Sequence, residues 1–513
     1  MTNCNLYHLL RERLPTEHGD AVFAVLNDGR NYTYSDVENV TARFAQTLVS
    51  LGLHPGDRVA AQVEKSIEAL LLYLATVRAG GVFLPLNTAY TPHEIEYFLT
   101  DAEPRIFFCD PANLSALTPV AAKAGALIET LGVYKNGDDL SQFGSFLPKV
   151  PERAEFRTVA RAKDDLATIL YTSGTTGRSK GAMTTHENLW SNAVTLCDYW
   201  HFSPKDTLLH ALPIFHTHGL FTSTNTILAA GSSMIWLPRF DADRVIAELP
   251  NATTMMGVPT FYTRLLDRED FTKDLVSHIR LFVSGSAPML TETHEQFQVR
   301  TGHTILERYG MTETQMNTSN PYNGERIPGT VGFPLPDVDI KITDPESGQV
   351  LPSGEIGMIE VRGPNVFKGY WRMPDKTAEE LRETGFFITG DLGKIDTSGY
   401  VSIVGRSKDL IISGGYNIYP KEIEEAIDDL PGVLESAVIG APHPDFGEGV
   451  VAVVVPAPGI ELSENGIITG LSDQLARFKQ PKRVFFAKEL PRNAMGKVQK
   501  KALRDEHAKL FST

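Results

Sequence analysis

One segment of the chain is the most informative about its fold, and it reads Tyr171-Thr172-Ser173-Gly174-Thr175-Thr176-Gly177-Arg178-Ser179-Lys180-Gly181. An apolar run from Leu166 to Tyr171 precedes it, and a helix-starting pattern follows. Glycines let the backbone bend and bring its N–H groups close to an anion. The hydroxyls add donors, and Arg178 and Lys180 add positive charge. We therefore expect a loop that holds polyphosphate.

The segment has two other interpretations. It is not a Walker A loop, because that pattern requires adjacent Gly and Lys followed by Ser or Thr, whereas Lys180 follows Ser179 and precedes Gly181. A plain surface turn rich in Gly, Ser and Thr is the second alternative, and the density of donors argues against it.

Length and composition indicate a globular chain of more than one domain. Its 513 residues exceed what one hydrophobic core usually serves. The net charge of −15 disfavours a nucleic-acid binder. Cys4, Cys109 and Cys197 lie too far apart in sequence for a disulfide framework, which favours a reducing compartment. The N-terminus does not resemble a signal peptide, and the most apolar run, 69–77, is too short to cross a bilayer. We expect a cytoplasmic protein without a membrane span.

Short apolar runs alternate with helical patterns through the first four-fifths of the chain, for example at 169–171, 208–212, 233–237 and 281–283. This alternation is typical of an α/β domain with sheets covered by helices. After the phosphate loop, Thr184 and Glu187 match a capping box. The helix that follows would carry on one face Leu189, Ala193, Leu196 and Trp200.

The pattern changes near residues 405–409. Beyond them, Tyr419-Pro420 begins a helix with proline at its first position, and 433–439 and 450–455 have the composition of strands. This is enough for a small α+β domain. We predict a large N-terminal domain, residues 1–407, and a small C-terminal domain, residues 408–513.

Further segments carry functional groups. The run Tyr309 to Thr314 joins an aromatic ring that can stack on a purine to a carboxylate that can hold Mg2+. Asp391 and Arg406 offer partners for ribose hydroxyls. The segment 413–417 is a glycine-containing turn, and 491–497 ends in Gly496-Lys497. Taken alone, Lys497 would be a solvated surface lysine.

In their order along the chain, these motifs resemble the acyl-CoA synthetases of the adenylate-forming superfamily, which also includes firefly luciferase and the adenylation domains of peptide synthetases. The resemblance covers essentially the whole chain. It implies the adenylate-forming enzyme fold, with a large α/β N-terminal domain and a small mobile α+β C-terminal domain. It also implies two half-reactions. A carboxylate attacks the α-phosphate of MgATP and expels pyrophosphate, and a thiol, usually that of CoA, then attacks the acyl adenylate and expels AMP.

The resemblance assigns the expected roles residue by residue. Lys497 would bridge the acid carboxylate and the α-phosphate as a mobile point charge, with Thr312 and His216 as the other catalytic residues and Glu313 as the Mg2+ ligand. The expected ATP-binding residues are Thr172, Ser173, Gly174, Thr175, Thr176, Gly177, Lys180, Gly285, Ser286, Ala287, Glu307, Arg308, Tyr309, Gly310, Met311, Thr312, Asp391 and Arg406.

The family also turns its small domain between the two half-reactions. The hinge would be Lys408 or Asp409. One orientation delivers the catalytic lysine, and the other withdraws it and brings Gly414 and Gly415 to the CoA channel.

The family leaves the acid open, and the resemblance implies that segments 211–219 and 256–266 line its pocket. Pro259 suits the first turn of a helix, and Thr260 and Arg264 then share a face. Burying an unpaired cation is costly, but a guanidinium pairs well with the second carboxylate of a diacid. The stretches 216–219 and 261–264 also resemble the malonyl-CoA synthetases. We predict malonate, with methylmalonate as a second candidate, bound by His216, Arg264, Ser286 and Met311.

Several alternatives stay open. Arg264 would be unremarkable in a surface salt bridge with Asp267 or Asp270. The acid could instead be acetate, a medium-chain acid or an aryl acid. A protein that loads a carrier domain, and a nucleotide-binding protein without catalysis, are further alternatives, although the joint presence of Lys497, Glu313 and Asp391 argues against the latter. The expected partners are malonate, ATP with Mg2+, and CoA, and the expected assembly is a monomer or homodimer.

Overall fold

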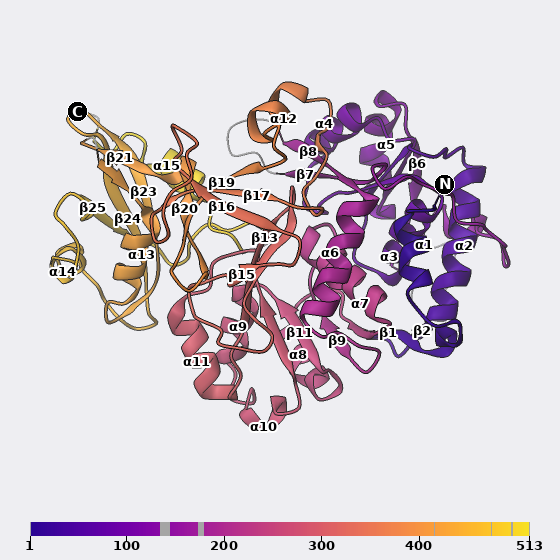
Figure 1. Ribbon diagram of the computed structural model, residues 1–513, viewed down its shortest axis with the longest axis horizontal. Helices are drawn as coiled ribbons and strands as arrows, with labels where there is room; N and C mark the ends of the chain where they lie inside the picture. The colour runs from indigo at the N-terminus through magenta and orange to yellow at the C-terminus, as the bar shows by residue number, and fades with distance from the viewer. Residues whose placement is uncertain are drawn as a thin grey trace.

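The computed structural model describes residues 2–133, 144–172, 179–414, 416–472, 474–493 and 496–511. These residues form four β-sheets with helices packed around them (Figure 1). The two largest sheets are built from the N-terminal part of the chain, and the last sheet, drawn in gold, lies to one side of them. The predicted fold class, α/β sheets covered by helices followed by a small α+β unit, is confirmed.

The largest sheet has nine strands in the order β15-β14-β13-β12-β11-β9-β10-β1-β2. The six from β13 to β1 run parallel. Its strands are β1 (Val22–Leu26), β2 (Asn31–Thr33), β9 (Thr207–His210), β10 (Ser233–Trp236), β11 (Thr254–Gly257), β12 (Leu281–Ser284), β13 (Leu306–Met311), β14 (Gln315–Ser319) and β15 (Phe333–Pro334). Ligands of parallel sheets bind beyond the carboxyl ends of the strands, which directs attention to the segments after β9, β11, β12 and β13.

The second sheet has seven strands in the order β18-β8-β7-β4-β3-β5-β6. They are β3 (Arg58–Gln62), β4 (Val82–Pro85), β5 (Ile106–Cys109), β6 (Leu127–Thr130), β7 (Leu166–Thr172), β8 (Lys180–Thr185) and β18 (Gly369–Tyr370). The strands β7 and β8 pair antiparallel, with Thr172 opposite Lys180. The predicted phosphate loop therefore joins two neighbouring strands, and its residues Ser173 to Arg178 lie outside the described part of the chain.

The helix after this loop begins later than predicted. It is α6 (His186–Tyr199), and its capping box is formed by Thr185 and Asn188 instead of Thr184 and Glu187. The reason is that β8 continues its pairing with β7 through Thr185, which keeps Thr184 in the sheet opposite Thr168. The cap consequently moves one residue along the chain.

The helices of the N-terminal part surround the two large sheets. They are α1 (Leu6–Glu12), α2 (Tyr34–Ser50), α3 (Ile67–Arg78), α4 (Pro92–Ala102), α5 (Leu114–Lys123), α6, α7 (Thr224–Ala230), α8 (Ala242–Glu248), α9 (Pro259–Leu266), α10 (Lys273–Val276), α11 (Thr291–Thr301) and α12 (Pro374–Glu380). Every residue of α3 is buried, and its side chains join the same hydrophobic cluster as both large sheets. Within the described ranges, no helix combines the length and apolar character that a bilayer crossing requires.

Two smaller sheets complete the fold. The four-stranded sheet contains β16 (Asp339–Thr343), β17 (Gly357–Arg362), β19 (Phe387–Ile395) and β20 (Val401–Arg406). The C-terminal sheet contains β21 (Ile411–Ser413), β22 (Tyr416–Ile418), β23 (Val433–His443), β24 (Gly447–Pro456) and β25 (Arg483–Phe486), flanked by α13 (Pro420–Asp428), α14 (Glu464–Gly470) and α15 (Lys500–His507). Two hydrophobic clusters made of residues beyond 410 line its faces. This separate core is compatible with the domain limits at 407 and 408, which stay a prediction.

Candidate active site

A cavity of about 800 Å³ lies where the two large sheets meet the C-terminal residues. Segments far apart in sequence converge on it, including the ends of β7 and β13, the loop after β9 and the loop before α15. Among the predicted site residues, its lining includes Thr172, Lys180, His216, Ser286, Arg308, Gly310, Met311, Thr312, Glu313, Arg406, Lys408, Asp409 and Lys497. The sequence motifs are therefore assembled around one space.

Other predicted residues lie behind this lining or outside it. Tyr309 is buried and donates from its hydroxyl to Asp391 at 2.5 Å, and Asp391 pairs with Arg406 at 2.6 Å. Glu307 is also buried, and burial raises its pKa to about 8. The remaining predicted residues are divided between described positions away from the lining, Gly285, Ala287, Arg264 and Gly414, and positions outside the described ranges, Ser173, Gly174, Thr175, Thr176, Gly177 and Gly415.

Lys497 reaches the cavity from a tight turn of the C-terminal part. Asn493 holds this turn, since its side chain accepts from the Lys497 backbone N–H at 3.0 Å. Gly496 has a φ of +74°, and a Cβ there would lie 3.3 Å from Thr260 Oγ1 in α9. Desolvation by the cavity walls, followed by the charge of Arg406, lowers the pKa of Lys497. The glycine thus lets the turn sit against the N-terminal part with the lysine inside the cavity.

Lys180 belongs to a network of charged and hydroxyl groups. Its Nζ lies 3.1 Å from both carboxylate oxygens of Glu380 and 4.1 Å from the centre of the Tyr370 ring. The Tyr370 hydroxyl contacts Glu380 at 2.6 Å and Glu313 at 3.1 Å. Sequence reasoning missed Tyr370 and Glu380, because no spacing or motif links them to a lysine almost two hundred residues earlier.

Glu313 fits the predicted Mg2+ ligand. It is a buried carboxylate that lines the cavity beside Thr312, and hard oxygen donors of this kind suit Mg2+. When bound, the ion would supply positive charge to a polyphosphate in the cavity. The hinge candidates also border this space, and Asp409 pairs with Arg504 of α15 at 2.8 Å.

Arg308 is a buried cation that has no counterion among the described residues. It is 4% exposed, and its Nε and Nη2 atoms have no hydrogen-bond partner among the described residues. Burial lowers its pKa to about 9. Gly285 makes room for it, because a Cβ there would lie 2.5 Å from the guanidinium carbon. Such a group needs an anionic ligand.

His218 and Ser286 line the same end of the cavity. Ser286 Oγ and His218 Nδ1 are 3.2 Å apart, and His218 Nε2 is buried without a partner in the described chain. Burial, followed by the charge of Arg308, lowers the pKa of His218 well below its usual range. His216 is nearby, and burial lowers its pKa to about 4. Both imidazoles are therefore neutral at physiological pH, and the fixed positive charge at this end belongs to Arg308.

Arg264 is placed differently from the prediction. It is exposed and does not line the cavity in the described structure. The apolar face of α9, with Phe261, Tyr262 and Leu265, packs into the core, and Arg264 lies away from that face. The alternative salt bridge is also not seen, since Arg268 is the residue that pairs with Asp270, at 3.0 Å.

Comparisons with known proteins agree with this site. Residues 11–371 match the family model described as AMP-binding enzyme, and residues 422–497 match the AMP-binding enzyme C-terminal domain. The chain is 32% identical to a malonate–CoA ligase of Arabidopsis thaliana, covering 94% of this chain and 85% of the relative. It is 33% identical to a long-chain-fatty-acid–CoA ligase of Bacillus subtilis (strain 168), covering 93% and 90%.

Solved structures give a closer match. The chain is 57% identical to MatB from Rhodopseudomonas palustris, with the whole of both chains covered. The TM-score is 0.96 against the ATP-bound crystal structure of that protein and 0.85 against its apo crystal structure. The arrangement described above, with the Lys497 turn at the cavity, is thus closer to the ATP-bound form of that relative.

Proposed function

Because the chain belongs to the AMP-binding enzyme family, we propose that it is an AMP-forming acid–CoA ligase whose acid is malonate. It would convert malonate, ATP and CoA to malonyl-CoA, AMP and pyrophosphate through a malonyl adenylate. The observation that carries the choice of acid is Arg308, a buried guanidinium that faces the cavity without a counterion among the described residues. Arg308 was expected among the ATP-binding residues, and we assign it to the acid in place of the exposed Arg264. The second carboxylate of a diacid would supply that counterion in a bidentate pair, which a monocarboxylate cannot form while its one carboxylate is at the α-phosphate.

In the first half-reaction, two anions must approach each other, so positive charge has to lie between them. Lys497 is suited to this role, because it lines the cavity and its ammonium is a compact point charge on a flexible side chain. Thr312 would contact the α-phosphate. Lys180 would exchange Glu380 for a phosphate oxygen, as part of the loop from Thr172 to Lys180.

The nucleoside would lie beside a second group of residues. Tyr309, Asp391 and Arg406 form one connected set, with contacts of 2.5 Å and 2.6 Å. We assign the ribose hydroxyls to Asp391 and Arg406 and the adenine to Tyr309 and to the backbone of 285–287. Glu307 would support this wall from behind as a buried carboxyl group.

In the second half-reaction, Lys497 would leave and the thiol of CoA would enter. We assign the hinge to Lys408 and Asp409, which lie between β20 and β21, and the CoA channel to Gly414 and Gly415. Rotation there would also change the surroundings of the Asp409–Arg504 ion pair. The higher TM-score against the ATP-bound relative supports the view that the described arrangement is the one for adenylation.

The family alone does not decide the acid, since the fatty-acid ligase is about as similar to this chain as the malonate ligase is. A ligase for another short, medium-chain or aryl acid is the alternative. The site argues for a diacid at the Arg308 end, completed by His216, Ser286 and Met311. The methionines Met311 and Met316, which also line the cavity, are adaptable side chains, and they make methylmalonate the second acid to test.

We also propose that the protein acts in the cytoplasm as a monomer or homodimer, on small molecules and not on nucleic acid. The acidic net charge of −15 argues against nucleic acid as a ligand.

The test is acid-dependent AMP formation with MgATP and CoA across malonate, methylmalonate, succinate, acetate, octanoate and benzoate. Malonate should give the highest kcat/KM. Arg308→Met should reduce the value for malonate by about a hundred-fold, the size expected for loss of a buried charged hydrogen-bonded pair, while ATP binding is retained. Arg264→Met is the matched arginine variant at the exposed site. A preference for acetate, octanoate or benzoate in the wild type would overturn malonate and keep the enzyme class.

A further inference from the structure

Lys65 lies at the junction of the two large sheets, in the loop between β3 and α3. Its side chain is buried, with 8% exposed. The ammonium donates to the carbonyl oxygens of His210 at 2.9 Å and Leu237 at 2.6 Å, and contacts His210 Nδ1 at 2.8 Å. His210 ends β9, and Leu237 directly follows β10. One cation from the seven-stranded sheet thus caps two neighbouring parallel strands of the nine-stranded sheet.

These contacts determine the proton position on His210. Because the carbonyl oxygen of Gly219 can only accept, His210 Nε2 carries the imidazole proton, and Nδ1 is left to accept from Lys65. That proton is donated to the carbonyl of Gly219 at 2.8 Å. Gly219 packs closely on the start of the same loop, since a Cβ there would lie 2.0 Å from the carbonyl oxygen of Pro213. A continuous chain of contacts therefore runs from Lys65 through His210 to Gly219.

The segment between His210 and Gly219 carries cavity-lining side chains, namely Phe215, His216, Thr217 and His218. Ala211, Leu212 and Ile214 pack in the core, whereas Phe215 lies between two cavities. A second cavity of about 270 Å³ lies beside the first, and both are lined by Pro85, Leu86 and Phe215. Lys65 itself lines the second cavity. The middle of the loop, at Phe215, therefore has less packing around it than its ends, where Lys65 and His210 make their contacts.

We infer that Lys65 is a positioning residue for acid binding: acting through His210, it holds both ends of the 211–219 loop, and with them His216 and His218, at the acid end of the active-site cavity. The inference rests on the proposed function, because it assigns the 211–219 loop to the acid. In this assignment, Lys65 contacts neither the acid nor ATP. Burial lowers the pKa of Lys65 well below its usual range, and no charged partner in the described structure offsets that burial.

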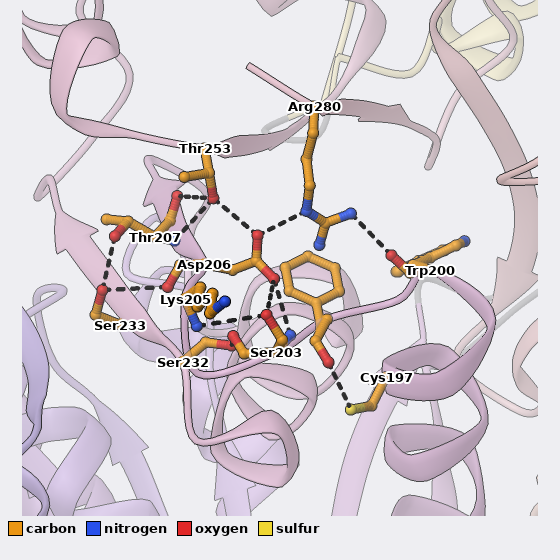
Figure 2. Close-up of polar contacts among 11 residues, drawn as sticks. Cys197, Trp200, Ser203, Lys205, Asp206, Thr207, Ser232, Ser233, Thr253 and Arg280 are labelled. Atoms are coloured by element: carbon orange, nitrogen blue, oxygen red, sulfur yellow. Dashed lines mark hydrogen bonds and ion pairs between the residues drawn. The ribbon is translucent and has the colours of Figure 1, made fainter. Parts of the chain in front are cut away.

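The experiment separates positioning from general stability by comparing Lys65 with Arg280, a half-buried cation at the other end of the parallel strands that Lys65 caps. Lys65→Met and His210→Leu break the contact chain at different points. His210→Gln restores it, since the amide oxygen can accept from Lys65 and the amide nitrogen can donate to Gly219. The matched control is Arg280→Met, which removes a cation that pairs with Asp206 at 2.6 Å at the opposite end of the strands (Figure 2).

Steady-state kinetics of AMP formation, with acid and ATP varied separately, give the readout. Lys65→Met and His210→Leu should raise the KM for the acid about ten-fold or more, with the KM for ATP changed by less than about two-fold, as expected for a lost buried hydrogen bond felt by one substrate. His210→Gln should stay within about three-fold of the wild type. Arg280→Met should lower Tm without changing the ratio of the two KM values.

The inference is overturned if the folded Lys65 and His210 variants change both KM values equally or change neither. It is also overturned if Arg280→Met shifts the acid KM as strongly as they do. If Lys65→Met does not fold, His210→Leu decides, because it leaves Lys65 with its two carbonyl acceptors. The wild-type acid panel tests the proposed function on its own, and the variants are assayed with whichever acid the wild type prefers, so the two failures are distinguishable.

Discussion

The charged groups at the two ends of the same parallel strands differ in whether they have partners of opposite charge. At the amino ends of β9, β11 and β12, Asp206 accepts from Arg280 at 2.6 Å, from the Ser203 backbone at 2.8 Å and from Thr253 at 3.0 Å (Figure 2). Arg280 also donates to the carbonyl of Trp200 at 3.0 Å. Burial raises the pKa of Asp206, but Arg280 outweighs it and holds the pKa below its usual range.

At the carboxyl ends, buried polar atoms are left without partners. Arg308 Nε and Nη2, His218 Nε2, Ser284 Oγ and Thr217 Oγ1 are all buried with no hydrogen-bond partner in the described ranges. Both ends contain an arginine with an unpartnered nitrogen, since Arg280 Nη2 also lacks a partner in the described ranges. Arg280 is half-buried and pairs with Asp206, whereas Arg308 is buried and faces a cavity. Native proteins satisfy most buried polar groups, so a cluster of exceptions marks a place where a ligand completes the structure. We conclude that the amino end of the strands stabilises the sheet and that the carboxyl end binds the substrates.

The strongest way to sharpen this comparison is to remove Lys497, which adds charge at the ligand end without contributing to the core. Lys497→Ala should reduce adenylate formation by about 10²–10³-fold, because a preorganised charge at the reacting phosphate is lost. Tm should change little, since the side chain is exposed within the cavity. Acid-dependent pyrophosphate release gives the first quantity and calorimetry the second. Wild-type adenylation rates in this variant would remove Lys497 from the catalytic residues.

The next test replaces one arginine at each end of the strands and measures the free energy of unfolding. Arg280→Met leaves Asp206 buried and unpaired, which should cost about 3 kcal/mol of unfolding free energy, as in other broken buried pairs. Arg308→Met removes a cation that has no counterion in the described chain, so the free energy of unfolding should not fall. Urea denaturation without ligand measures both. Equal destabilisation by the two variants would contradict the distinction between the two ends.

Local patterns in the sequence predicted the fold well. Alternating apolar runs located β7, β10 and β12, and Tyr419-Pro420 marked the start of α13. The error at the Thr184 cap had a tertiary cause, because pairing between β7 and β8 extends to Thr185. Sheet order, which brings segments from far apart to the same edge, has no local signal and required the structure.

The site was predictable where a motif carries it and not where side chains meet from distant elements. Lys180, Thr312, Glu313 and Lys497 line one cavity as expected, and their roles stay predictions. Helix spacing placed Arg264 on the face of Thr260, but domain packing determines exposure, and Arg264 is exposed. No pattern links Lys65 to His210, or Lys180 to Glu380, because such contacts depend on three-dimensional packing alone.

A smaller effect is expected where the C-terminal part meets the ligand end. Gly496 has a φ of +74° and leaves 3.3 Å between its Cβ position and Thr260. Gly496→Ala should slow adenylation by about ten-fold, since alanine in a left-handed conformation costs about 1 kcal/mol and the contact becomes tight. The reaction of supplied malonyl adenylate with CoA should not change. Adding Thr260→Gly should recover the part of the loss that comes from the contact, and equal slowing of both half-reactions would contradict a role confined to adenylation.

The smallest effect concerns the pH dependence at the amino end. Asp206 has a folded-state pKa below its usual value, so its contribution to stability is present above the unfolded pKa, about 4, and is lost as pH falls through the lower folded pKa. The Tm difference between the wild type and Asp206→Asn should therefore be constant from pH 7 to pH 5 and shrink below about pH 4. The difference between the wild type and Arg308→Met should stay flat there, because Arg308 has no carboxylate partner in the described structure to titrate. A Tm difference for Asp206→Asn that grows on acidification would mean that the aspartate destabilises the folded state, and the amino end would then resemble the ligand end.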